Sequence, residues 1–267
     1  MKNVLLLIHD DAGQEARLQA ALDVTRALDG HLACLDVTIA PVMVDDYVPT
    51  GGSALLIAEE REREKANRAA VEARLAREGV PYDWRDVAGN LGACLRDAAT
   101  LADVIVINRQ LDHVHFPDMI ALAGDLLVHA QTPVLAVPQQ ARGFDAAGAA
   151  LVAWDGSQPA QEALQAAAPL LRLAREVTIV AIDNGTLRAP AEDAARYLAR
   201  HGIEPLVRNV PAGREKASDL LLAELRSAGA AYLVMGGFGR SRMVEAMFGG
   251  VTRRLLANSP VPLLLAH

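Results

Sequence analysis

Glycine residues cluster near the C-terminus of this chain in a pattern suited to holding a phosphate. The segment MGGFGRS at 235–241 follows an apolar run at 231–234, and GGVT at 249–252 leads into a helical pattern. Glycines let backbone amides turn toward an anion, and the exposed amides at a helix N-terminus favour negative charge. Arg240 adds a positive charge and Thr252 a hydroxyl group. The spacing therefore predicts a phosphate-binding loop, with a tight glycine turn among surface arginines as the alternative.

Acidic residues stand at the ends of two apolar runs. Asp155 follows the run at 149–154, and the segment HDD at 9–11 follows the run at 4–8. Polar residues at the carboxyl ends of parallel strands normally line a ligand crevice without being catalytic. Ser157 lies in no Gly-x-Ser-x-Gly turn, and we expect it to cap the next helix. We therefore assign no catalytic residue, and the question of an enzymatic activity stays open.

Two histidines raise the alternative of a metal site. His113-x-His115 has Asp118 and His129 in its neighbourhood, and alternate residues of an extended segment point the same way. A further ligand at a spacing typical of metal sites is missing. We therefore interpret this segment as a polar loop and predict no metal.

Parallel strands are needed to position these residues, and the chain supplies them twice. The segment LQAA at 18–21 returns at 164–167, which sets an offset of about 146 residues between the halves. Short β-branched runs alternate with helical patterns, which indicates two tandem α/β domains, each with a doubly wound five-stranded parallel sheet. The expected domains are 1–138 and 149–267, joined by a linker at 139–148. The expected strands lie near 3–8, 31–38, 82–87, 103–107, 133–137, 149–154, 176–182, 204–210, 231–235 and 261–265.

The first half lacks the glycine loop. The segment INRQL stands at 107–111 where the second half has its glycines, and Gly124-Asp125 stands in place of Gly249-Gly250. We expect the carboxylate of Asp125 to face the phosphate position and to repel the ligand. The first site is therefore predicted to be degenerate for triphosphates.

Charge and composition narrow the range of partners. The net charge is −7, so attraction to nucleic acid or to anionic lipid is not expected. The acidic excess lies in the first half, and residues 143–267 are close to neutral. The chain has two cysteines without a CxxC spacing, and its apolar runs are too short for a signal peptide or a membrane span. We expect a cytoplasmic protein that has neither nucleic acid nor a membrane as its partner.

The spacing Gly236-x2-Gly239-x9-Gly249 resembles the nucleotide loop of the universal stress protein family, whose usual form is Gly-x2-Gly-x9-Gly-Ser/Thr. The duplication resembles the tandem members of that family. Gly250 departs from the pattern, because Ser or Thr is usual at this position. Without this hydroxyl one hydrogen bond to the phosphate is lost. The loss costs on the order of 1 kcal/mol of binding free energy, which weakens nucleotide binding without abolishing it.

The resemblance implies two Rossmann-like domains of the adenine nucleotide α-hydrolase type, packed as an intramolecular pseudo-dimer whose closing strands, 133–137 and 262–265, pair antiparallel. It also implies a stress-response regulator that binds an adenine nucleotide in its second half: ATP, with or without magnesium, or another such as AMP. The alternatives are a partner-interaction module that binds no nucleotide and a slow ATP-hydrolysing enzyme; a homodimer and a protein partner are further options. The assigned nucleotide-binding residues are Ala153, Asp155, Ile182, Met235, Gly236, Gly239, Arg240, Gly249, Gly250, Val251 and Thr252.

Overall fold

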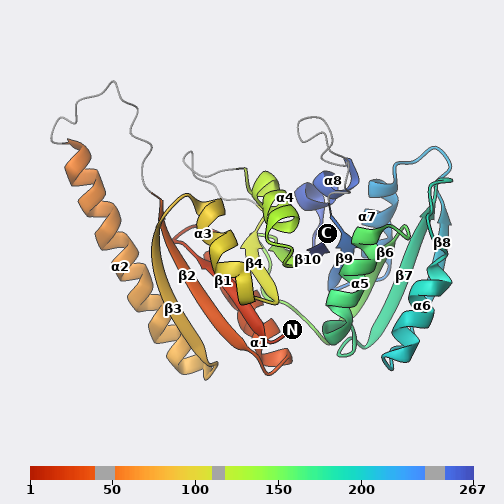
Figure 1. The fold of residues 1–267 in the computed structure, drawn as a ribbon, viewed down its shortest axis with the longest axis horizontal. Coiled ribbons are helices and arrows are strands. Elements are labelled where there is room, and N and C mark those ends of the chain that lie inside the picture. The colour runs from red at the N-terminus through yellow and green to blue at the C-terminus, as the bar shows by residue number, and fades with distance from the viewer. Residues whose placement is uncertain (40–51, 110–117, 238–249) are drawn as a thin grey trace.

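A computed structural model describes residues 1–39, 52–109, 118–237 and 250–267, in which strands and helices alternate along the chain (Figure 1). The first half contains β1 (Asn3–Ile8), α1 (Gln14–Ala27), β2 (His31–Ile39), α2 (Gly52–Glu78), β3 (Tyr82–Gly89), α3 (Leu91–Ala98), the 3-10 turn η1 (Ala99–Leu101), β4 (Val104–Asn108), α4 (Met119–His129) and β5 (Val134–Val137). The second half contains β6 (Ala149–Trp154), α5 (Gln158–Leu171), β7 (Glu176–Asp183), α6 (Ala191–Arg200), β8 (Leu206–Pro211), α7 (Ala217–Ser227), β9 (Tyr232–Gly236), α8 (Gly250–Asn258) and β10 (Leu263–Ala266).

The strands of the described residues form one ten-stranded sheet in the order β3-β2-β1-β4-β5-β10-β9-β6-β7-β8. Neighbouring strands within each half are parallel. The halves meet where β5 and β10 pair antiparallel, with Leu263 opposite Ala136 and Leu265 opposite Val134. The predicted fold class and the predicted antiparallel pairing of the closing strands are therefore confirmed.

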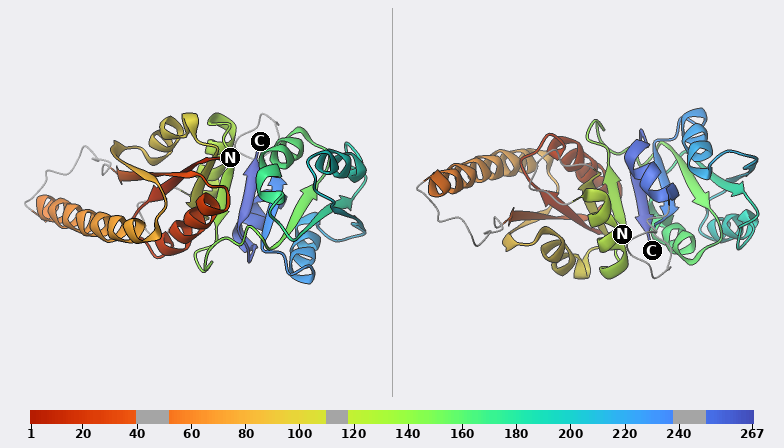
Figure 2. Two further views of the ribbon diagram at one scale, coloured as in Figure 1. Left: turned by 90° about the horizontal axis from the view of Figure 1, so that it is seen from below. Right: turned by 90° about the horizontal axis from the view of Figure 1, so that it is seen from above.

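Helices cover both faces of the sheet, as the two views in Figure 2 show. The apolar residues of α1, α2, α5 and α6 pack on one face, and those of α3, α4, α7 and α8 pack on the other. Strand β1 contributes Val4, Leu6 and Ile8 to the first face and Leu5 and Leu7 to the second. Burial on both faces explains why the strands read as continuous apolar runs. None of the described helices is long and apolar enough to cross a membrane.

The predicted linker is packed into the structure along part of its length. Phe144 is 5% exposed, and its ring lies 4.8 Å from that of Tyr232 at the start of β9. The amide of Phe144 donates a hydrogen bond of 2.9 Å to the carboxylate of Asp23 on α1. Residues of both halves therefore hold the connection in place.

Candidate functional site

The carboxyl ends of β6, β7 and β9 bring together several of the residues predicted to bind a ligand. Ala153 of β6 pairs with Met235 of β9 on one side and with Val180 of β7 on the other. Ile182 is the next-to-last residue of β7, and Gly236 is the last residue of β9. In doubly wound sheets the ligand lies at the carboxyl ends of the strands, where the strand order reverses. That reversal, here called the β6/β9 switch point, falls between β6 and β9.

Asp155 lies in a tight turn directly after β6. Its carboxylate accepts a hydrogen bond of 2.9 Å from the amide of Ser157, and its carbonyl oxygen accepts one of 2.8 Å from the amide of Arg188. Gly156 has a φ of +73°, and a Cβ there would collide with the backbone nitrogen of Ala189. The turn thus requires glycine at 156 and holds the exposed Asp155 at the edge of the sheet.

Ser157 begins helix α5 as the sequence predicts. Its hydroxyl oxygen accepts a hydrogen bond of 3.3 Å from the amide of Ala160, which is the usual contact of an N-cap serine. Ser157 therefore has a structural role at the candidate site.

Gly236 is required by packing in addition to any contact with a ligand. A Cβ at this position would lie 2.6 Å from the backbone nitrogen of Ala160 and 2.7 Å from the carbonyl carbon of Pro159. The N-terminus of α5 thus rests directly on the end of β9. The glycine at 236 has a structural explanation that holds with or without a phosphate.

The N-terminus of α8 is the second half of the predicted phosphate loop. Gly250 is the first residue of this helix and is exposed, and a Cβ built there meets no atom within 4 Å. Val251 is half-buried, and Thr252 is 6% exposed, so of these three residues Gly250 is the most accessible to a ligand. Gly239, Arg240 and Gly249 lie outside the described residues.

The corresponding place in the first half is filled by a buried polar network. Arg17 of α1 is fully buried, and its guanidinium lies 2.7 Å from the carboxylate of Asp11. It also donates hydrogen bonds to the carbonyl oxygens of Leu7 and His9, at 2.7 and 2.6 Å, and to the side-chain oxygen of Asn108. Burial lowers the pKa of Arg17, and the charge of Asp11 opposes that shift. These contacts occupy the carboxyl ends of β1 and β4.

Asp125 does not close the first site, and that expectation is wrong. It lies in the middle of α4, where its carboxylate pairs with Arg96 of α3 and lies 2.8 Å from the ring nitrogen of His129. The N-terminus of α4 is capped instead by Asp118, whose carboxylate accepts hydrogen bonds from the amides of Ile120 and Ala121 at 2.9 and 3.4 Å. A carboxylate of the chain itself therefore takes the place that an anion would occupy at this helix.

Two of the residues considered for a metal site lie far apart. Asp118 and His129 lie at opposite ends of α4, which are about 16 Å apart at the rise of an α-helix. Among the described residues no group of three potential ligands is placed to hold a metal. His113 and His115 lie outside the described part of the chain.

Comparisons with known proteins show which family the C-terminal part of the chain resembles. Residues 187–267 match the sequence model of the universal stress protein family. The C-terminal part of this chain is therefore similar in sequence to universal stress proteins. A universal stress protein from Archaeoglobus fulgidus shares the fold over 99% of this chain and 97% of its own, with a TM-score of 0.75 and 18% identity. A putative universal stress protein from Pseudomonas aeruginosa covers 100% of this chain and 93% of its own, with a TM-score of 0.56 and 18% identity.

Two further comparisons complete these findings. A universal stress protein solved in complex with cAMP covers 45% of this chain and 96% of its own, with a TM-score of 0.38 and 21% identity. A search of curated proteins finds no match.

The two halves of the sheet have the same strand order. The places where this order reverses, between β1 and β4 and between β6 and β9, differ by complementary substitutions. At the offset of about 146 residues, Arg17 corresponds to Ala163 and Gly13 to Pro159; by their places in the two sheets, Asn108 at the end of β4 corresponds to Gly236 at the end of β9. A Cβ on Gly13 would lie 2.7 Å from the side chain of Asn108, just as one on Gly236 would meet Pro159. The first half therefore places large polar side chains where the second half has alanine and glycine, a difference that an alignment of the halves would have revealed.

Proposed function

We propose that this protein binds an adenine nucleotide, ATP in the first instance, at the β6/β9 switch point and acts as a stress-response regulator. One observation supports this proposal above the others. Two exposed groups that suit a nucleotide follow the strands of the β6/β9 switch point: Asp155 directly after β6, and Gly250 at the start of the helix that follows β9. In this proposal the domains are 1–138 and 149–267, paired as an intramolecular pseudo-dimer through β5 and β10.

Each part of a nucleotide has a suitable group at this site. The exposed carboxylate of Asp155 suits ribose hydroxyls, which donate hydrogen bonds. Ala153 is half-buried, and Ile182 and Met235 are 8% and 5% exposed. These apolar side chains lie next to the ends of the three strands, where the proposal places the base. The exposed first turn of α8, with Gly250 at its start, suits a phosphate because helix N-terminal amides and the helix dipole favour negative charge. Gly239, Arg240, Gly249, Val251 and Thr252 complete the proposed set.

The proposal is tested first with the full-length protein as purified. Denaturation followed by mass spectrometry detects a co-purified nucleotide, and calorimetry with ATP, with and without magnesium, measures the affinity of the emptied protein. We expect bound ATP, ADP or AMP, or else saturable binding with a rise in the melting temperature. A protein that carries no nucleotide and shows neither binding nor a thermal shift would refute the proposal and would favour a module that binds protein partners only.

Two variants at one position separate binding from folding. Asp155→Asn keeps an acceptor for the amide of Ser157, which the carboxylate holds at 2.9 Å, but loses the negative charge. Asp155→Ala loses both. We expect both variants to weaken ATP binding, and only Asp155→Ala to lower the melting temperature as well. Equal affinity in the wild type and both variants would show that Asp155 does not contact the ligand.

A further inference from the structure

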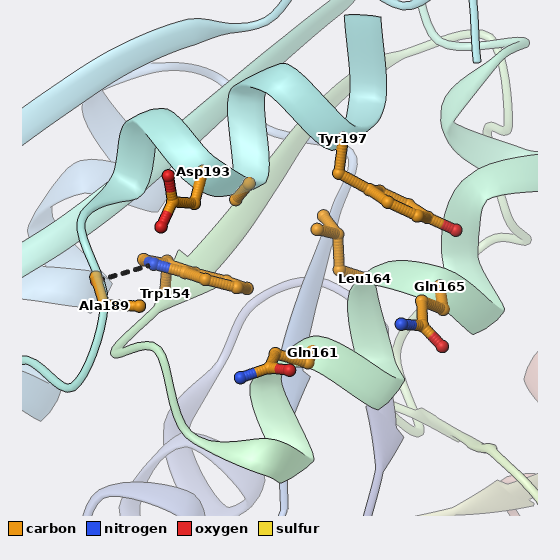
Figure 3. A pocket seen from close by; sticks show the side chains of 8 residues that line it. Trp154, Gln161, Leu164, Gln165, Ala189, Asp193 and Tyr197 are labelled. Carbon is orange, nitrogen blue, oxygen red and sulfur yellow. Dashed lines mark hydrogen bonds between the residues drawn. The ribbon is translucent and has the colours of Figure 1, made fainter. Parts of the chain in front are cut away.

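A cavity of about 220 Å³ lies between α5 and α6 (Figure 3), next to the turn that holds Asp155. Trp154, Leu164 and Ala194, which line it, belong to the face of the sheet covered by α1, α2, α5 and α6, whereas the apolar residues of α8 pack on the opposite face. The nucleotide proposal leaves this cavity without a role. The residues that line it are Trp154, Gln161, Leu164, Gln165, Ala189, Asp193, Ala194 and Tyr197.

The walls of the cavity are largely apolar and are held in position. The indole nitrogen of Trp154 donates a hydrogen bond of 3.0 Å to the carbonyl oxygen of Ala189, which fixes the ring (Figure 3). Leu164, which is 2% exposed, lies between Trp154 and Tyr197. The Tyr197 ring is supported from behind by His201, with 4.6 Å between the ring centroids. Trp154, which is 5% exposed, and the half-buried Tyr197 flank Leu164, and the edges and faces of such rings suit a flat ligand.

The polar groups at the rim present mainly hydrogen-bond acceptors. The amide nitrogen of Gln161 already donates to the carbonyl oxygen of Gly156 at 3.1 Å, so its side-chain oxygen remains as an acceptor. Asp193 adds a carboxylate, one oxygen of which lies 3.0 Å from the guanidinium of Arg196. The lining residues include this one acidic side chain and no lysine or arginine. The cavity therefore favours a ligand that donates hydrogen bonds, and a cationic ligand would compete with Arg196 for the carboxylate of Asp193.

The size of the cavity limits the ligand to about one ring, because pockets for drug-sized molecules span roughly 300–1,000 Å³. We propose that the α5–α6 cavity binds a small planar cation, such as an aromatic amine or an amidinium. Its ring lies against Trp154 and Tyr197, where cation–π attraction adds to apolar contact, and its N–H groups face Asp193 and Gln161. This proposal does not depend on nucleotide binding.

Benzamidine serves as the probe, and the fluorescence of Trp154 serves as the readout. The chain has two tryptophans, so Trp84→Phe leaves Trp154 as the single reporter in the full-length protein. We expect benzamidine to change this fluorescence saturably, neutral benzamide to bind more weakly, and benzoate not to bind. A response that is linear in benzamidine, or equal for benzamidine and benzoate, would overturn the proposal.

Two neighbouring carboxylates provide a matched pair of variants. Asp193→Asn removes the charge at the cavity, whereas Glu192→Gln removes the same charge from the same turn of α6 outside the lining set. We expect Asp193→Asn to weaken benzamidine binding about fivefold, the upper range for a partly exposed charge contact, and Glu192→Gln to leave it nearly unchanged. Gln165→Glu, a change at an exposed rim position, is expected to strengthen binding. Equal effects of the two carboxylate variants would show that general electrostatics, and not this cavity, governs the binding.

Discussion

Replacing Gly250 with serine tests the proposed phosphate site at the position where the glycine loop of the second half departs from the universal stress protein pattern that it resembles. The side chain fits, because a Cβ at Gly250 meets no atom within 4 Å and the residue is exposed at the start of α8. Gly250→Ala is the matched control. Both substitutions remove the flexibility of glycine at the helix start, and only serine adds a hydroxyl.

The expected gain follows from one hydrogen bond. A hydroxyl that donates to a phosphate oxygen at an exposed helix N-terminus is worth about 1 kcal/mol, which corresponds to about fivefold in the dissociation constant. Gly250→Ser should therefore bind ATP about five times more tightly than Gly250→Ala. The melting temperatures of the two variants without ligand should be close to each other.

Isothermal titration of ATP into the two variants and the wild type measures this difference. We expect Gly250→Asp to lower the affinity for ATP, because a carboxylate at this position repels phosphate. If serine and alanine give the same affinity, or if aspartate binds ATP as well as glycine does, then the start of α8 does not hold the phosphate.

Three further predictions concern stability. Burial, together with the nearby charges of two acidic residues, raises the pKa of Asp36 to about 6, so the folded state loses stability as the pH rises from about 4 to 6. After allowance for solvent screening, Asp36→Asn should be about 1 kcal/mol more stable than wild type at pH 8. The two proteins should be equally stable below about pH 4, and urea titrations at both pH values measure the difference. Arg17→Met leaves the buried carboxylate of Asp11 without its cationic partner, and we expect it to lower the free energy of unfolding by about 3–5 kcal/mol, measured by chemical denaturation. A decrease below about 1 kcal/mol would contradict the role given to this pair. Tyr232→Phe removes a buried hydroxyl that has no partner among the described residues; it should leave the thermal stability unchanged or raise it by up to about 1 kcal/mol, whereas a large loss would reveal a bond to the hydroxyl.

The architecture was predictable because its signals are strong and local. Runs such as 4–8 and 149–154 are apolar without interruption, and only strands buried on both faces need such a pattern. The internal repeat then predicted that strands and helices follow one another in the second half in the same order as in the first. The antiparallel contact of β5 with β10 was predicted by the family resemblance alone.

The role predicted for Asp125 in the first site is wrong. Spacing counted from the glycines of the second half placed Asp125 at a helix start, whereas α4 begins seven residues earlier, counted from its N-cap Asp118. An aspartate ahead of an apolar run is itself a signal for a helix start, and the segment at 118–124 carries it. Local capping chemistry, and not spacing carried over from the other half, sets the start of this helix.

Two roles of site residues could not be read from a single sequence. A glycine that approaches a phosphate and a glycine that lets a helix rest on a strand look identical, and Gly236 is required for the second reason. Arg17 reads as an ordinary helical arginine, because its partner Asn108 lies 91 residues further along the chain. Long-range contacts of this kind appear only when the chain is folded.

The pairing of β5 with β10 also has a consequence for divergence between the halves. Because one chain supplies both strands, each half always meets the same partner in a one-to-one ratio, and the pairing does not weaken on dilution. Two identical subunits must keep one sequence that serves both positions. In a single chain, substitutions such as those that form the Arg17 network can occur in the first half of the sheet while the corresponding residues of the second half stay different.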